Sequence, residues 1–233
     1  MNRWIRQASV VCSVAFVVAT ARAQCPTRAP AFTVDGAIGG VNDMAVFDDG
    51  SGSKLYAAGA VSAAGDVAAR GVARWDGTRW EAVGALLGST TGASSISALA
   101  VFDDGAGAKL YASGNFTTGA GDAADYVASW NGSAWTTVGA GPGTEVYSLR
   151  VLDFGQGPQL AAGVYAWGSS PLRVWNGSSW QSYSGGVFAG RVIGAEMYNG
   201  SLYVAAEGNF SNGVLRWNGA GWTGIGPALA GTM

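Results

Sequence analysis

An internal duplication constrains the fold of this chain more than any other feature of its sequence. Residues 41–84 align with residues 96–139 at a shift of 55 positions, and 21 of the 44 aligned residues are identical. Both copies contain the pattern A-V-F-D-D-G-x-G-x-K-L-Y-A-x-G, and both end in V-A-x-W-[DN]-G-x-x-W-x-x-V-G. A repeat of this length indicates that one small supersecondary unit recurs along the chain.

Two shorter and more diverged copies follow the duplicated pair. The third contains V-W-N-G-S-S-W at residues 174–180, and the fourth contains W-N-G-A-G-W at residues 217–222. The sequence therefore predicts four repeats, at residues 41–84, 96–139, 146–184 and 191–226, followed by a tail at residues 227–233. A segment at residues 24–40 precedes them, in which Ala31 to Val34 is typical of an extra outer strand.

Each repeat has the pattern of short strands joined by tight turns, because its apolar stretches are brief and separated by Gly, Asp and Asn. Asn131 and Gly132 are expected to form a hairpin turn, since both tolerate the positive φ that such a turn needs. In the second repeat the expected strands are Ser97–Phe102, Lys109–Gly114, Tyr126–Trp130 and Ala134–Val138. Each repeat is therefore predicted to be a four-stranded antiparallel sheet.

A single four-stranded sheet leaves two apolar faces exposed, so the repeats are expected to stack face to face. Radial stacking of such sheets makes a β-propeller. Four residues separate the two tryptophans of each W-[DN]-G-x-x-W motif, which places both rings opposite each other on one face of a hairpin. We expect these pairs to pack between the sheets: Trp75 and Trp80, Trp130 and Trp135, Trp175 and Trp180, Trp217 and Trp222.

The motifs point to a family. The W-[DN]-G-x-x-W pattern, the small residues that end the second strand (Ala58-Gly59, Ser113-Gly114, Ala162-Gly163) and the V-A-x-W strands resemble the kelch-related, Rax2-like propellers of secreted or surface proteins. The resemblance covers residues 41 to about 226 and implies an all-β, propeller-type array. Two alternatives stay open at this stage: the four repeats close a ring, or they belong to a longer array.

The N-terminus has the pattern of an export signal. Arg3 and Arg6 precede an apolar run from Val10 to Ala19, and the sequence A-R-A at residues 21–23 provides a small-x-small cleavage site. The apolar run is too short for a membrane span, which needs roughly 20 apolar residues. Residues 1–23 are therefore predicted to be a signal peptide, which makes the remaining chain secreted or cell-surface and without a membrane span.

Composition excludes several function classes. The chain contains no histidine, so neither a histidine-based catalytic triad nor an imidazole metal site is possible, and the copper-oxidase chemistry of some kelch propellers is excluded too. A net charge of −2 gives no basic surface for a phosphate backbone. The sequence predicts no cofactor, no nucleic-acid partner and no enzyme activity.

Two acidic turns admit two interpretations. Asp48 and Asp49, like Asp103 and Asp104, could contribute carboxylates to a calcium site. The favoured interpretation is a polar turn in which Asp caps the backbone and Gly takes a positive φ, because the carboxylates do not alternate with spacer residues as calcium loops require. No metal site is therefore predicted.

The candidate ligand-binding residues lie in the connections and strand ends of the repeats, where binding usually resides on a rigid scaffold. Trp167 is the one tryptophan after the signal that lies outside the pairs, and Tyr165 stands two residues before it; Asp66 and Asp122 follow glycines between the second and third strands. We expect an exported binding or scaffolding protein that acts on a protein or a carbohydrate. The alternative is a propeller hydrolase or lyase that uses carboxylates and tyrosines.

Overall fold

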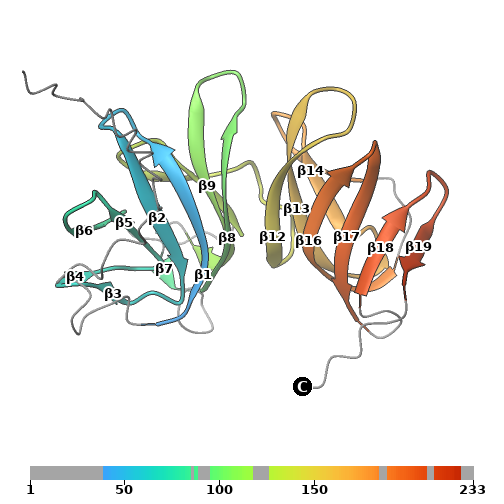
Figure 1. Ribbon diagram of the computed structural model, residues 1–233, viewed down its shortest axis with the longest axis horizontal. Helices are drawn as coiled ribbons and strands as arrows, with labels where there is room; N and C mark the ends of the chain where they lie inside the picture. Colours follow the sequence, from blue (N-terminus) through green and yellow to red (C-terminus); the bar gives the residue numbers. More distant parts are fainter. Residues whose placement is uncertain are drawn as a thin grey trace, which may run out of the picture.

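A computed structural model describes residues 39–84, 87–88, 95–117, 126–183, 188–208 and 213–226. All regular secondary structure in these ranges is β-structure, in 19 strands (Figure 1). The all-β class predicted from the sequence is confirmed. The predicted signal peptide, the expected outer strand at Ala31 to Val34 and the tail at residues 227–233 lie outside the described residues.

The principal strands form four antiparallel units of four strands, each connected in the same order. Unit 1 comprises β1 (Val41–Asp48), β2 (Ser53–Gly59), β5 (Val72–Trp75) and β6 (Trp80–Ala82). Unit 2 comprises β8 (Ser95–Asp103), β9 (Ala108–Thr117), β10 (Val127–Trp130) and β11 (Trp135–Thr137). Unit 3 comprises β12 (Val146–Asp153), β13 (Pro158–Ser169), β14 (Leu172–Trp175) and β15 (Trp180–Ser182). Unit 4 comprises β16 (Phe188–Tyr198), β17 (Ser201–Glu207), β18 (Gly213–Trp217) and β19 (Trp222–Ile225).

Three further pairings were not expected from the sequence. The short strands β3 (Ala63–Ala64) and β4 (Val67–Ala68) form a ribbon between β2 and β5. The strand β7 (Leu87–Gly88) pairs with the end of β9. The end of β13 pairs with β16, which joins units 3 and 4 into one eight-stranded sheet.

The third and fourth strands of each unit are joined by a capped turn. In unit 2, Oδ1 of Asn131 accepts hydrogen bonds from the backbone N–H groups of Ser133 and Ala134, each at 2.9 Å. Gly132 between them has a φ of 97°. The predicted turn at Asn131 and Gly132 is confirmed, and Asp76, Asn176 and Asn218 cap the corresponding turns of the other units. Two expected strands were too long: β11 lacks Ala134 and Val138, and Tyr126 precedes β10 with a φ of 55°, which is not a strand conformation.

The hydrophobic core lies between successive units. One cluster joins Phe47 and Tyr56 of unit 1 to Leu110 of unit 2, a second joins units 2 and 3, and a third joins units 3 and 4. The tryptophan pairs of units 2, 3 and 4 take part as expected, because each belongs to the cluster shared with the preceding unit. The pair of unit 1 differs, since Trp80 packs on a separate cluster within that unit. Because the core is divided among these junctions, each unit is stabilised mainly by its neighbours.

The first strands of units 2 and 3 each serve two junctions at once. On β8, Ile96 and Leu99 pack toward unit 1, whereas Ala98, Ala100 and Phe102 pack toward unit 3. A β-bulge between Ile96 and Ala98 shifts the alternation, which is why two residues three positions apart share a face. The same bulge recurs in β1, β12 and β16. The duplicated sequence therefore carries a duplicated distortion of the backbone.

The first strands pack against one another in chain order, β1 on β8, β8 on β12 and β12 on β16 (Figure 1). An ion pair of 3.8 Å between Asp43 of β1 and Arg150 of β12 spans β8. The first strands of units 1, 2 and 3 therefore lie close together at this point. The described strands show no closed ring, and units 1 and 4 lie at opposite ends of Figure 1. The finer expectation of a β-propeller stays a prediction.

Candidate functional site

The end of β13 presents two aromatic side chains to solvent. Tyr165 and Trp167 are 47% and 67% exposed, whereas Ala166 between them is buried, as strand alternation requires. Pairing of Tyr165 with Arg191 and of Ala166 with Gly190 of β16 holds this extension in place. The expected candidates Tyr165 and Trp167 are therefore both displayed on one face of a strand that is anchored in the eight-stranded sheet.

Charged and polar groups lie beside these rings. Arg191 is directly opposite Tyr165, and its Nε donates a hydrogen bond of 2.8 Å to Oε2 of Glu207 on β17. The guanidinium carbon of Arg191 also lies 5.2 Å from the ring centre of Tyr147, a cation–π contact. The hydroxyl of Tyr147 in turn donates to Glu145 at 2.9 Å. We call Tyr165, Trp167, Arg191 and Glu207 the rim platform.

The other two candidates are not part of this platform. Asp66 is exposed in the turn between β3 and β4, and this ribbon lies at the far left of Figure 1, away from β13. Asp122 lies outside the described residues. The sequence could group these four residues only as members of connecting segments, because it does not show which connections meet in space.

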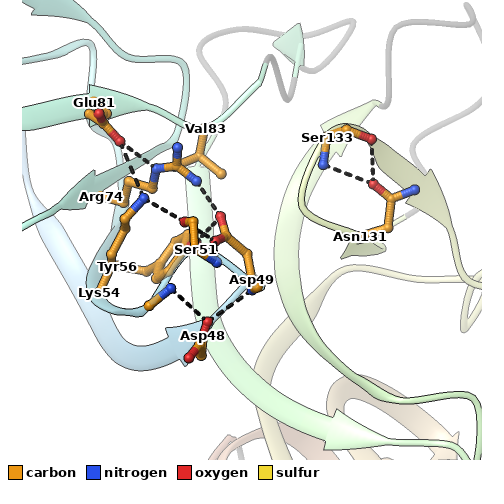
Figure 2. Close-up of polar contacts among 12 residues, drawn as sticks. Asp48, Asp49, Ser51, Lys54, Tyr56, Arg74, Glu81, Val83, Asn131 and Ser133 are labelled. Carbon is orange, nitrogen blue, oxygen red and sulfur yellow. Dashed lines mark hydrogen bonds and ion pairs between the residues drawn. The ribbon is translucent and has the colours of Figure 1, made fainter.

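The acidic turn of unit 1 is engaged in local hydrogen bonds. Oδ1 of Asp48 accepts the N–H groups of Gly50 and Gly52 at 2.9 and 3.0 Å, and these glycines have φ values of 94° and 100°. Asp49 turns inward, where it accepts a hydrogen bond of 3.1 Å from the Tyr56 hydroxyl and forms an ion pair with Arg74 (Figure 2). Both carboxylates thus perform the capping role of a polar turn.

The network around Asp49 favours the ionised carboxylate. Burial alone would raise the pKa of Asp49, but hydrogen bonds from Ser51 and Tyr56 and the charge of Arg74 outweigh it, so the pKa lies below its ordinary value. Arg74 is also held by Glu81, with 2.8 Å between Nε and Oε2 (Figure 2). The arrangement is a structural clamp on the turn between β1 and β2.

The equivalent turn in unit 2 repeats the cap but not the clamp. Asp103 accepts the N–H groups of Gly105 and Gly107 at 2.8 and 3.0 Å. Asp104 pairs with Lys109 at 3.1 Å and faces the buried Tyr111. Burial, with a smaller contribution from the Asp104 carboxylate, raises the pKa of Tyr111 to about 12. Across the described ranges, no three acidic or cysteine side chains gather in a way that could hold a metal ion.

A groove that the sequence did not indicate lies between units 3 and 4. Its volume is about 320 Å³, and Phe154 and Tyr183 of unit 3 face Arg216 and Trp217 of unit 4 across it. The rings of Phe154 and Tyr183 are 4.8 Å apart. A smaller groove of about 220 Å³ lies at the corresponding junction of units 2 and 3, beside Asp103 and Asp104. Both grooves lie at the same kind of junction between consecutive units. The alignment of the repeats, which shows that this junction recurs, could have indicated their positions.

No protein-family model matches the chain, and comparison with curated proteins finds no significant match. The described part of the chain contains no helix long and apolar enough to cross a membrane. The evidence on function therefore rests on the geometry of the rim platform and the grooves.

Proposed function

We propose that this chain is an exported, non-catalytic binding or scaffolding protein of the β-propeller type, related to the kelch-like, Rax2-like repeats that its motifs resemble. It holds a carbohydrate or a protein segment on the rim platform. The observation that carries the proposal is the exposure of Trp167, 67% in a chain whose other described tryptophans are buried or half-buried.

An exposed tryptophan on a rigid strand suits ligand contact. Burying an aromatic ring removes ~150 to 250 Å² from water, so leaving one exposed forgoes much stabilisation unless a ligand covers it. Tyr165 and Trp167 are two residues apart on β13, which puts their Cα atoms ~6.6 Å apart along the strand. Arg191 and Glu207 add donors and acceptors beside them. Large aromatic contacts with a polar border are the composition of binding hot spots.

The combination favours a ligand with apolar faces and polar edges. A sugar ring has this character, since its C–H face can stack on an indole while its hydroxyls reach the guanidinium and carboxylate nearby. A peptide side chain with an apolar face and polar edges would also fit the platform. Binding of a protein ligand is therefore the second result that the test can give.

Binding to immobilised polysaccharides tests the proposal. We expect residues 24–233, the chain left after the predicted cleavage, to be retained saturably on at least one polysaccharide, with a change in tryptophan fluorescence. Trp167→Ala should abolish retention and Trp167→Phe should keep part of it, because phenylalanine preserves a stacking face. Both variants should melt at the wild-type temperature, since the indole is exposed.

Two results would redirect the proposal. Absence of retention by a folded chain on every polysaccharide would favour a protein ligand on the same platform. Retention that is unchanged in Trp167→Ala would remove the rim platform from consideration and shift attention to the groove between units 3 and 4.

A further inference from the structure

The last unit exposes a face that is buried in every other unit. The alignment of the repeats makes Tyr198 of β16 equivalent to Phe47, Phe102 and Leu152 of the preceding first strands. Those three side chains are 5%, 9% and 2% exposed because the following unit covers them, whereas Tyr198 is 62% exposed. Its partner Tyr203, 6.0 Å away between ring centres, repeats the Phe47–Tyr56 pair of unit 1.

The same contrast holds across the rest of that face. Val214 is 38% exposed, although the equivalent Val72 and Val127 are fully buried. Ile225 is 45% exposed, whereas the equivalent Val83 is 1% exposed. We call Tyr198, Tyr203, Val214 and Ile225 the trailing face of unit 4.

Unit 1 exposes the opposite kind of face. Met44 of β1 is 60% exposed, but its equivalents Leu99 and Leu149 are 4% and 0% exposed because each packs on the preceding unit. Val41 is 44% exposed, whereas the equivalent Ile96 is fully buried. Met44 and Val41 form what we call the leading face of unit 1. Val46 beside them is 64% exposed, but it does not mark this face, because its equivalents Val101 and Val151 are each 37% exposed as well.

The two exposed faces are the two halves of one junction. At each internal junction the earlier unit contributes its trailing positions, such as Phe47 and Val72, and the later unit contributes its leading positions, such as Ile96 and Leu99. Three such junctions occur within the chain, between units 1 and 2, 2 and 3, and 3 and 4. The trailing face of unit 4 and the leading face of unit 1 therefore have the chemistry to form a fourth.

We propose that a second copy of this chain supplies the missing half, so that the leading face of one copy docks on the trailing face of another. The contact continues the internal series, because it pairs the same repeat positions in the same order. Trp80 packs on Val61, Ala64 and Ala69 of the β3–β4 region, so β1 rather than β6 forms the centre of the leading face. Such a head-to-tail contact uses two different surfaces, and it either closes a ring of copies or extends into a filament. The inference is independent of the rim platform.

Sedimentation analysis over a roughly hundredfold dilution series tests for this contact. The wild-type chain should increase in mass with concentration, and Met44→Asp and Tyr198→Asp should each remain monomeric. The substituted side chains are exposed, so both variants should keep the wild-type melting temperature as monomers. Gln181→Asp, which adds the same charge at an exposed position of β15, should associate like the wild type.

Mixing Met44→Asp with Tyr198→Asp provides the decisive test of the contact. Met44→Asp retains an intact trailing face and Tyr198→Asp an intact leading face, so the mixture should form a one-to-one heterodimer although neither variant associates alone. The proposal would be overturned if neither the wild type nor the mixture of the two variants associates. It would also be overturned if the wild type were monomeric and both substitutions lowered its melting temperature, because the two faces would then meet within one molecule.

Discussion

The indole Nε1 of Trp135 in unit 2 donates a hydrogen bond of 2.7 Å to the carbonyl oxygen of Val83 in unit 1. Trp180 of unit 3 makes the same bond, at 2.9 Å, to Val138 of unit 2, and Val138 is the repeat equivalent of Val83. In units 2 and 3 the second tryptophan of the W-[DN]-G-x-x-W motif is thus a polar as well as an apolar contact with the preceding unit, a role that a phenyl ring could not fill.

Replacement of Trp135 should separate these two contributions. Trp135→Phe removes the donor and leaves the Val83 carbonyl unpaired, so the free energy of unfolding should fall by about 1 to 3 kcal/mol. Trp135→Ala also removes the ring and should cost about 3 to 5 kcal/mol. Urea denaturation followed by circular dichroism measures both. Trp167→Phe, at an exposed indole, is the matched control, and equal losses in Trp135→Phe and Trp167→Phe would contradict the role of the hydrogen bond.

Asp49 and its repeat equivalent Asp104 should respond differently to substitution. The Asp49 side chain is 3% exposed in its ion pair with Arg74, so Asp49→Asn should lower the free energy of unfolding by about 2 to 4 kcal/mol. Asp104 is 26% exposed and pairs with Lys109, so Asp104→Asn should cost less than about 1 kcal/mol. Comparable losses at the two positions in chemical denaturation would show that the turn, not the buried clamp, is the stabilising feature.

Gly163 of β13 should not accept a side chain. A Cβ atom there would lie 2.3 Å from Oγ of Ser148 and 2.5 Å from the backbone oxygen of Val192, at the junction of units 3 and 4. Gly163→Ala should therefore destabilise the protein by about 1 to 3 kcal/mol, as overpacking does in a close-packed interior. Gly224→Ala is the control, because open space surrounds that position. Differential scanning calorimetry should show a lowered melting temperature only for the first variant.

The carboxyl group of Asp76 should resist protonation in acid. Hydrogen bonds from the Thr78 hydroxyl at 2.7 Å and from the N–H groups of Arg79 and Thr78 lower its pKa to about 2. Since the folded pKa lies below the unfolded value of ~3.9, the associated stability is complete above that value and is lost as the pH falls toward about 2. Carboxyl-carbon NMR titration should show the pKa of Asp76 rising in Thr78→Ala. Ser133→Ala, which removes the corresponding hydroxyl of unit 2, should leave it unchanged.

Much of the fold was predictable because the information is local to each repeat. The strand expected at Ser97–Phe102 lies within β8 and that expected at Lys109–Gly114 lies within β9, since short apolar stretches between turn residues determine them. The rings of Trp75 and Trp80 face each other at 5.6 Å, as the four-residue separation indicated. These features follow from turn chemistry and strand alternation alone.

What the sequence could not provide depends on contacts between units. Trp167 lies on the part of β13 that pairs with β16, and this pairing unites residues of two repeats and has no counterpart among the described strands of units 1 and 2. The groove beside Phe154 and Trp217 likewise exists only where two units meet. Asp49 and Asp104 occupy identical motifs, yet Arg74 of unit 1 is replaced by Ser129 in unit 2, so only one turn gains a buried ion pair.

The division of the core among junctions has a consequence for how such a protein can evolve. Each repeat encodes both a leading and a trailing half-interface, so recombination that inserts or removes a whole repeat leaves every remaining boundary with matched halves. A deletion of half a repeat would instead remove part of both half-interfaces, because residues of both faces lie on the same strand, as Leu99 and Phe102 do on β8. Gene duplication can thus lengthen this architecture without new compensating mutations, and the near-copy of residues 41–84 at 96–139 is the record that such an event would leave.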